Sequence, residues 1–191
     1  MRKILLICLF FLFFLFGLDG EGRIDWYRTQ FDTGNLGNCG PSSAAMVISW
    51  YTDTSINVKA VRDFIGFPLG KDGDVSFENL QRALTHFGVF SEMQTIKRIG
   101  DIDKLLNDGS LVIFLFVPKL IPIGKKGSRY GRNYLNNGSG HYSVIHGKEG
   151  KYFIINDPLP NGRDRYYRED FLTRALKTWM VLVVKRRIEW R

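Results

Sequence analysis

The chain contains little cysteine and little histidine. Of its 191 residues, two are cysteine and three are histidine. It has no Cys-x-x-Cys pair, no His-Glu-x-x-His motif and no glycine-rich phosphate loop, so the usual sequence signals of a zinc site or a nucleotide site are missing. We therefore expect no metal and no cofactor. Internal repeats are also missing, and the length suits one domain with a full hydrophobic core.

The longest apolar run lies at the N-terminus. Arg2 and Lys3 precede residues 4–18, which are almost wholly Leu, Ile and Phe, and polar sequence follows. A basic start with about 15 apolar residues is typical of a secretory signal peptide, whereas a spanning helix needs about 20. We predict a signal peptide over residues 1–20 and one domain over residues 21–191, exported to the periplasm or the extracellular space. A retained short membrane anchor is the alternative, and membrane association follows only in that case.

Removal of the signal peptide would leave Cys39 as the only thiol, because the other cysteine, Cys8, lies within the apolar run. Cys39 could then form no internal disulfide. An unpaired thiol in an oxidising compartment is a liability unless it is used. A buried, inert cysteine is the alternative, and the neighbouring residues help to decide between the two.

Cys39 directly precedes a strongly apolar segment. From Pro41 to Tyr51 the sequence is apolar nearly all round, which predicts a buried helix. Proline at the first helical position, with Gly40 before it, marks the helix start. Cys39 is therefore expected at the N-terminal end, where free N–H groups and the helix dipole favour a thiolate and lower its pKa. This position favours a nucleophile over a structural cysteine.

His141 begins the first of two strand-like runs that flank a short turn. A three-residue loop, Lys148–Gly150, would place His141 directly opposite Asp157, with Cβ atoms about 5 Å apart. A carboxylate at that distance would orient the imidazole and stabilise its protonated form. A four-residue loop would place Asn156 opposite His141 instead, and asparagine can also orient a catalytic histidine.

The other two histidines are weaker candidates. His146 lies five positions along the same strand from His141 and should point to the opposite face of the sheet. His86 lies within a helical pattern over residues 76–87 and is expected at or near the surface. His141 is therefore the preferred base.

Two motifs carry a resemblance to a known family. Residues 38–46 read Asn-Cys-Gly-Pro-Ser-Ser-Ala-Ala-Met, and His141 is followed sixteen residues later by Asp157-Pro158. This pair of motifs resembles the nucleophile and histidine motifs of the bacteriocin-processing (double-glycine leader) peptidases and their free-standing exported relatives, members of the papain-like cysteine peptidase superfamily. The resemblance covers roughly residues 26–184, and between the two motifs it is only architectural.

The resemblance implies an α+β, papain-like fold in which a central N-terminal helix carrying Cys39 packs on an antiparallel β-sheet carrying His141. It implies a cysteine peptidase with a Cys39, His141 and Asp157 triad that acts through a thioester acyl-enzyme. Related enzymes place a glutamine upstream of the nucleophile as an oxyanion donor, and Gln30 is the candidate here. It precedes Cys39 by nine residues, a longer spacing than expected for this family, and an ordinary exposed glutamine is the alternative.

The remaining pattern fits the same architecture. Each element is predicted from apolar periodicity and from local start and stop signals. Helices are predicted over 57–66, 76–87, near 101–107 and over 168–177, and strands over 89–96, 111–117, 141–146, 151–156 and 179–184.

Residues 118–140 form a long, glycine-containing segment that runs directly into His141 and has basic residues but no acidic ones. Long loops in compact domains are usually functional or disordered. One interpretation is a rim of the substrate cleft that attracts acidic partners, and the other is a solvated loop. The candidate rim residues are Lys125, Lys126, Arg129 and Arg132.

Three functions compete on these grounds. The leading hypothesis is hydrolysis of a peptide or protein substrate, with an acidic substrate as one interpretation of the basic segment. Acyl transfer, as in phytochelatin-synthase-like or transglutaminase-like enzymes, is the second, because the acceptor depends on the shape of the cleft. A non-catalytic binding module is the third, and the complete Cys39, His141 and Asp157 set argues against it. Basic residues are also found in nucleic-acid-binding proteins, but no nucleic-acid motif accompanies them here, so we expect no nucleic-acid partner.

Overall fold

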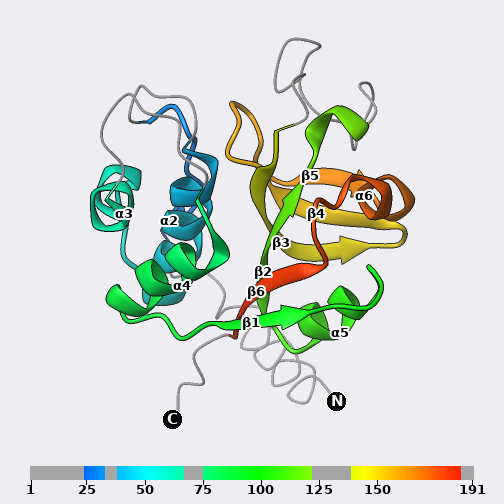
Figure 1. The fold of residues 1–191 in the computed structure, drawn as a ribbon, viewed down its shortest axis with the longest axis horizontal. Coiled ribbons are helices and arrows are strands. Elements are labelled where there is room, and N and C mark those ends of the chain that lie inside the picture. The colour runs from blue at the N-terminus through cyan, green and yellow to red at the C-terminus, as the bar shows by residue number, and fades with distance from the viewer. Residues whose placement is uncertain (1–23, 33–37, 67–74, 122–138, 186–191) are drawn as a thin grey trace, which may run out of the picture.

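The computed structural model describes residues 24–32, 38–66, 75–121 and 139–185. These residues form five α-helices, one 3₁₀ turn and six strands (Figure 1). In chain order they are α2 (Cys39–Thr52), α3 (Val58–Ile65), α4 (Phe77–His86), β1 (Glu92–Thr95), α5 (Asp101–Asn107), β2 (Leu111–Phe116), η1 (Pro118–Leu120), β3 (His141–Glu149), β4 (Tyr152–Asn156), β5 (Arg165–Arg168), α6 (Glu169–Ala175) and β6 (Met180–Val184).

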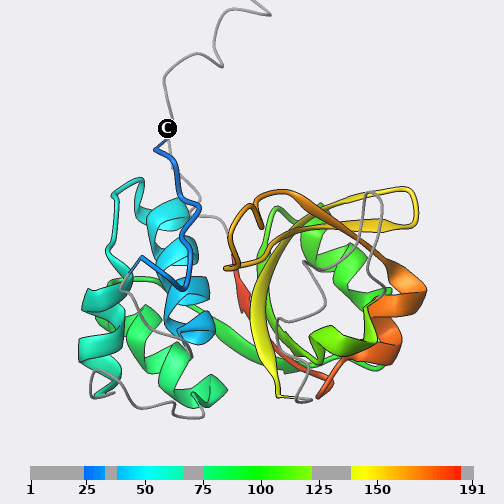
Figure 2. The same cartoon turned by 90° about the horizontal axis from the view of Figure 1, so that it is seen from above.

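The six strands form one antiparallel sheet in the order β1-β6-β2-β3-β4-β5. Helices α2, α3 and α4 gather on one side of this sheet, and the sheet curves around α5 and α6 on the other (Figure 2). Helix α2, which carries Cys39, packs against β3, which begins with His141. The α+β architecture expected from the sequence is confirmed.

Two hydrophobic clusters, one on each face of the sheet, form the core. Strand β2 contributes to both. Leu111 and Ile113 lie in the cluster beneath α2, α3 and α4. The alternate residues Val112, Phe114 and Phe116 lie in the cluster beside α5 and α6. Side chains alternate between the two faces of a strand, and here both faces are covered. This explains why the sequence of β2 is continuously apolar, since each fully buried aliphatic or aromatic side chain stabilises the fold by about 1.5–3 kcal/mol.

Capping residues set the bounds of α3 and α4. The Asn57 side chain accepts a hydrogen bond from the backbone N–H of Lys59 and caps α3, and Gly66 ends that helix with a φ of 87°. The Ser76 side chain caps α4 in the same way, accepting from the backbone N–H of Asn79. These caps explain why the predicted bounds of α3 and α4 agree with the structure.

Other elements differ from the prediction. Strand β1 begins at Glu92 rather than at residue 89, because the N–H of Val89 donates to the carbonyl of Leu84 and closes the end of α4. Helix α6 ends at Ala175, because the next residue forms a bridge to Phe116 of the sheet. Strand β5 was not predicted at all, since its four residues, Arg-Tyr-Tyr-Arg, are too few and too polar to show an alternating pattern.

The register of the β3–β4 hairpin also differs from both predicted registers. Glu149 pairs with Tyr152, so the loop has two residues rather than three or four. Gly150 has the expected positive φ, 56°. A bulge at His146 then shifts the pairing by one residue, so that Val144 faces Asn156 at the end of β4.

The bulge decides which face Asp157 occupies. Without it, the register at the turn would place Asp157 opposite Val144, on the face away from His141. With it, the position after Asn156 falls opposite Ser143, on the same face as His141 and two residues away. Such diagonal neighbours lie within reach of longer side chains. The bulge therefore brings Asp157 and His141 onto one face, although they are not directly opposite each other.

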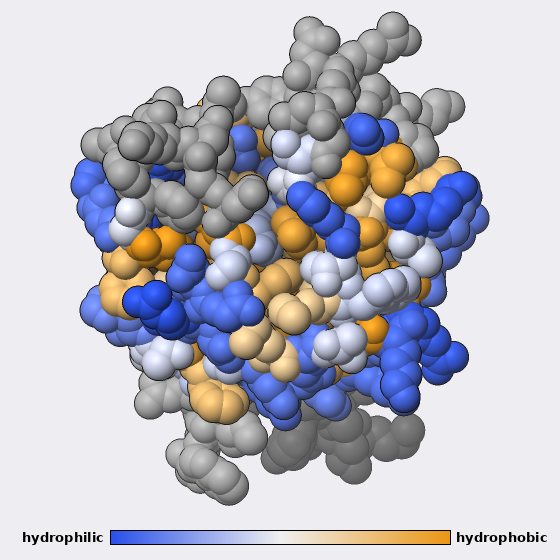
Figure 3. Space-filling view, in the orientation of Figure 1, coloured by the Kyte–Doolittle hydropathy of each residue, from blue (hydrophilic) through white to orange (hydrophobic). Residues whose placement is uncertain are grey.

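The described surface is mixed in polarity. On the face shown in Figure 3, apolar residues form separate areas between hydrophilic ones. Phe90 is the most exposed large hydrophobic residue of the described ranges, at 73%. Within those ranges, none of the helices is long and apolar enough to cross a membrane. The predicted signal peptide lies outside the described residues.

Candidate active site

Helix α2 presents Cys39 at its first residue. The helix begins two positions earlier than predicted, because the N–H of Ser42 donates to the carbonyl of Asn38 over 2.8 Å and closes the first turn there. Pro41 is tolerated as the third helical residue, since the first N–H groups of a helix have no partner within it. Cys39 is half-buried, and the helix behind it is buried through Ser49. The thiol therefore sits where a rigid, buried helix begins.

His141 opens β3 and is 1% exposed. It pairs with Phe116 of β2, whose ring contacts the imidazole edge-on at 5.5 Å between centroids. Its Nε2 lies 2.7 Å from Oδ1 of Asp157. The same side chain is hydrogen-bonded to Cys39, and because Nε2 is engaged by Asp157, Nδ1 is the nitrogen left for the thiol. His141 therefore bridges Cys39 and Asp157.

Asp157 is buried and receives hydrogen bonds on both carboxylate oxygens. Besides His141, its Oδ1 accepts from the backbone N–H of Leu159 at 3.2 Å. Its Oδ2 accepts from the hydroxyl of Tyr167 at 2.6 Å. The neighbouring Asn156 is equally buried but turns away, accepting from the N–H of Asp164 at 2.9 Å. The predicted alternative, in which Asn156 meets His141, is wrong.

Tyr167 was missed by sequence reasoning. It lies in β5, the strand that was not predicted. Its ring packs in the core cluster beside α5 and α6, with its centroid 5.7 Å from that of Phe116. No short motif marks it. Only the knowledge that a further strand pairs with β4 would have placed a tyrosine hydroxyl beside Asp157.

The contacts shift the pKa values of the central pair in opposite directions. Burial alone would raise the pKa of Cys39, but the hydrogen bond and the positive charge of His141, with the backbone N–H groups of Tyr142 and Gly40, lower it below its ordinary value. Burial alone would lower the pKa of His141, but the charge and hydrogen bond of Asp157, and then of Cys39, raise it to about 10. The arrangement therefore favours a thiolate beside an imidazolium.

Gln30 contacts the chain neighbours of both Cys39 and Asp157. It is 2% exposed, so the alternative of an exposed glutamine is wrong. Its backbone N–H donates to the carbonyl of Pro158 at 2.7 Å, and its carbonyl accepts from Nδ2 of Asn38 at 3.3 Å. Within the described residues its Oε1 is buried without a hydrogen-bond partner. The structure thus places Gln30 between the residue before Cys39 and the residue after Asp157.

Asn38 is itself held from α3. Its Oδ1 accepts a hydrogen bond from Nη1 of Arg62, and both side chains are almost fully buried. A buried guanidinium is costly unless its N–H groups are hydrogen-bonded. This contact links α3 to the start of α2.

The candidate rim residues Lys125, Lys126, Arg129 and Arg132 lie outside the described residues. At the ends of the predicted loop, Pro118–Leu120 forms a 3₁₀ turn, and Ser139 and Gly140 lead into β3. The rim interpretation therefore stays a prediction.

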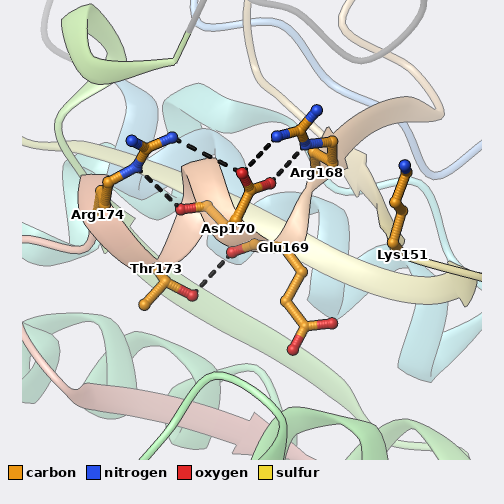
Figure 4. A pocket seen from close by; sticks show the side chains of 6 residues that line it. All are labelled: Lys151, Arg168, Glu169, Asp170, Thr173 and Arg174. Atoms are coloured by element: carbon orange, nitrogen blue, oxygen red, sulfur yellow. Dashed lines mark hydrogen bonds and ion pairs between the residues drawn. The ribbon is translucent and has the colours of Figure 1, made fainter.

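Other parts of the described structure are weaker candidates for a functional site. Within the described ranges, no group of three His, Cys, Asp or Glu side chains is arranged to hold a metal ion. A hollow of about 760 Å³ lies over β5 and α6 (Figure 4). Its charged side chains largely pair with one another, as Arg168 and Arg174 do with Asp170. The hollow is lined by Lys151, Arg168, Glu169, Asp170, Thr173 and Arg174.

Known proteins share both the sequence pattern and the fold. Residues 26–183 match the Peptidase_C39 like family. No curated protein matches the chain. Among solved structures, a C39-like peptidase from Bacillus anthracis is 17% identical, with a TM-score of 0.60 over 84% of this chain and 94% of that one.

Two further structures are similar. The peptidase domain of Streptococcus ComA, a bi-functional ABC transporter involved in a quorum-sensing pathway, is 15% identical, with a TM-score of 0.58 over 84% of this chain and 98% of that one. A double glycine motif protease from an AMS/PCAT transporter, in complex with the leader peptide, is 20% identical, with a TM-score of 0.55 over 88% and 96%. At these identities the likeness shows a shared fold.

Proposed function

The chain belongs to the Peptidase_C39 like family of cysteine peptidases, and on that premise we propose that it cleaves a peptide bond with Cys39 as nucleophile, His141 as general base and acid, and Asp157 as the group that orients His141. The observation that carries the proposal is the buried contact of 2.7 Å between His141 Nε2 and Asp157 Oδ1, which leaves Nδ1 for the thiol. Acyl transfer of this kind uses a nucleophile that contacts a base, with a carboxylate that orients the base.

The reaction follows from the protonation states. His141 holds the proton of Cys39, so the thiolate attacks the substrate carbonyl carbon and the carbonyl oxygen becomes an oxyanion. Collapse of this intermediate breaks the C–N bond, and His141 gives its proton to the leaving amine. A water molecule then attacks the thioester carbonyl carbon while His141 accepts its proton. Cleavage of the C–S bond releases the acid and returns Cys39 and His141 to the thiolate–imidazolium pair.

Two groups can stabilise the oxyanion. The backbone N–H of Cys39 lies at the start of α2, where N–H groups have no partner within the helix. The Gln30 side chain is the second candidate. Its burial and its backbone contacts to Asn38 and Pro158 support this role. Donors fixed in advance at a developing charge are worth about 2.7–4 kcal/mol each in related chemistry.

The substrate is proposed to be a peptide or protein. One structure of the same fold holds a leader peptide, and the basic residues of the predicted rim favour an acidic partner. The basic N-terminus and the apolar run after it support export of the enzyme, with residues 1–20 as a signal peptide or a membrane anchor.

A peptide screen tests the proposal. The full chain and its Cys39→Ala form are incubated with synthetic peptides that contain glycine pairs or acidic flanks, and the products are identified by mass spectrometry. Cleavage by the native protein alone is the expected result. Transfer of the acyl group to an added amine in preference to water would instead indicate an acyl transferase. Equal cleavage by both forms would remove Cys39 from the reaction.

A further inference from the structure

Beyond the triad, we propose that Tyr27 is a positioning residue that holds the Asp157 turn against the N-terminal segment and thereby fixes the carboxylate on His141. This inference rests on the proposed role of Asp157. Tyr27 lies in residues 24–32, a segment that follows the predicted signal peptide and contains no helix or strand. The sequence motifs gave no role to it.

The turn after β4 is closed tightly on itself. The N–H of Asp157 donates to the carbonyl of Gly162 at 2.8 Å, and the N–H of Gly162 donates to the carbonyl of Leu159 at 2.9 Å. A Cβ atom at Gly162 would lie 1.9 Å from the carbonyl oxygen of Asp157, so only glycine fits there. The backbone of Asp157 is therefore fixed by the closure of this turn.

The hydroxyl of Tyr27 contacts the backbone of this turn. Its oxygen lies 3.1 Å from the carbonyl oxygen of Asp157, donates to the carbonyl of Leu159, and accepts from the N–H of Gly162 at 3.0 Å. One hydroxyl thus meets three backbone groups of one turn. The phenol therefore adds hydrogen bonds to a turn that its own backbone groups already close.

The segment that carries Tyr27 is hydrogen-bonded to both the Asp157 turn and the loop between α2 and α3. Toward the turn, the N–H of Gln30 donates to the carbonyl of Pro158 at 2.7 Å. Toward the helices, Arg28 donates from Nε to the carbonyl of Ile56 at 3.1 Å and from Nη2 to the Ser55 hydroxyl at 2.7 Å. In Figure 2 the segment runs along α2 and faces the loop that follows β4. It therefore ties the half of the molecule that carries Cys39 to the turn that carries Asp157.

The phenol keeps its proton over the range in which the enzyme would work. Burial, with the negative charge of Asp157 nearby, raises the pKa of Tyr27 to about 12. The hydroxyl can therefore donate to a carbonyl and accept from Gly162 at the same time. Without it, the turn and its carboxylate gain freedom, the imidazolium of His141 is less well stabilised, and the thiolate of Cys39 loses part of its counter-charge.

The test compares Tyr27→Phe with Tyr152→Phe, which removes the same atom from a tyrosine of β4 whose ring packs against Tyr166. The rate of Cys39 alkylation by iodoacetamide is followed against pH in the full chain, with mass spectrometry to resolve Cys39 from Cys8. We expect the half-rate pH of Tyr27→Phe to rise by about one unit and that of Tyr152→Phe to stay unchanged. Melting temperatures show whether each variant is folded at the assay temperature.

Asp157→Ala separates failure of this inference from failure of the proposed function. If Asp157→Ala raises the half-rate pH and Tyr27→Phe does not, the triad stands and the positioning role of Tyr27 is refuted. If neither variant changes it, the proposed role of Asp157 is refuted as well. Should Tyr27→Phe be unfolded at the assay temperature, its profile is measured at a lower temperature at which it is folded. An unchanged profile there refutes the inference too.

Discussion

Replacing Asp157 by alanine should abolish most turnover, whereas replacing its neighbour Asn156 should not. Both residues are 2% exposed, and both side chains accept hydrogen bonds from the backbone around them. They differ in that only Asp157 contacts His141. Asn156→Ala is therefore a matched control for the general damage of removing a buried polar group at this place.

The magnitude follows from the protonation of His141. Its pKa of about 10, against an ordinary value of 6.5, corresponds at 1.36 kcal/mol per pKa unit to roughly 5 kcal/mol in favour of the imidazolium. Asp157 supplies the larger part of this preference and Cys39 the rest. Without Asp157, only Cys39 would oppose the effect of burial, which disfavours the imidazolium. In serine proteases, loss of the comparable carboxylate lowers kcat by about 10⁴-fold, and we expect a loss of that order here.

The assay is steady-state kinetics on a peptide identified by the screen. The loss should appear in kcat more than in KM, because the imidazolium is needed in the transition state rather than for binding. Asn156→Ala should lower kcat by less than tenfold, a cost below about 1.4 kcal/mol. Circular dichroism and melting temperatures must show that both variants are folded. The reverse ranking, or two mild effects, would refute the assignment of Asp157.

Three further predictions follow from the site and the chain around it. Gln30→Ala should lower kcat by about 10²–10³-fold with little change in KM if its side chain binds the oxyanion; a loss confined to KM would assign it to substrate binding. N-terminal sequencing of exported material should find a new N-terminus near residue 21, whereas intact Met1 in a membrane fraction would indicate an anchor. Neutralising the four rim residues should weaken binding of an acidic peptide and flatten its salt dependence without changing Cys39 alkylation; an unchanged salt slope would contradict the rim interpretation. Those residues are Lys125, Lys126, Arg129 and Arg132.

The architecture and the helix bounds could largely be predicted because their signals are local. Apolar periodicity, the Asn57 and Ser76 side chains and Gly66 place α3 and α4 without knowledge of the rest of the chain. The position of Cys39 at the start of α2 is also a local property, even though the first turn closes on Asn38 rather than later.

The contacts around Asp157 depend on long-range structure, and there sequence reasoning was less successful. The right partner for His141 was inferred from a wrong register, because a two-residue loop and a bulge at His146 together shift the pairing by an even number of positions. An even shift keeps Asp157 on the same face of the sheet. Tyr167 and Tyr27 reach the turn from a short polar strand and from an irregular segment. Neither has a periodicity that a sequence could reveal.

The pH dependence of Cys39 alkylation in the native protein and in His141→Ala tests the central claim most directly. The thiolate–imidazolium pair exists above the pKa of Cys39, which is lowered, and below the pKa of His141, which is raised. The native half-rate pH should therefore lie well below the ordinary thiol value of about 8.5. In His141→Ala burial remains and the main opposing charge is lost, so the half-rate pH should rise above that value. A native value at or above 8.5, or one that His141→Ala leaves unchanged, would contradict the account.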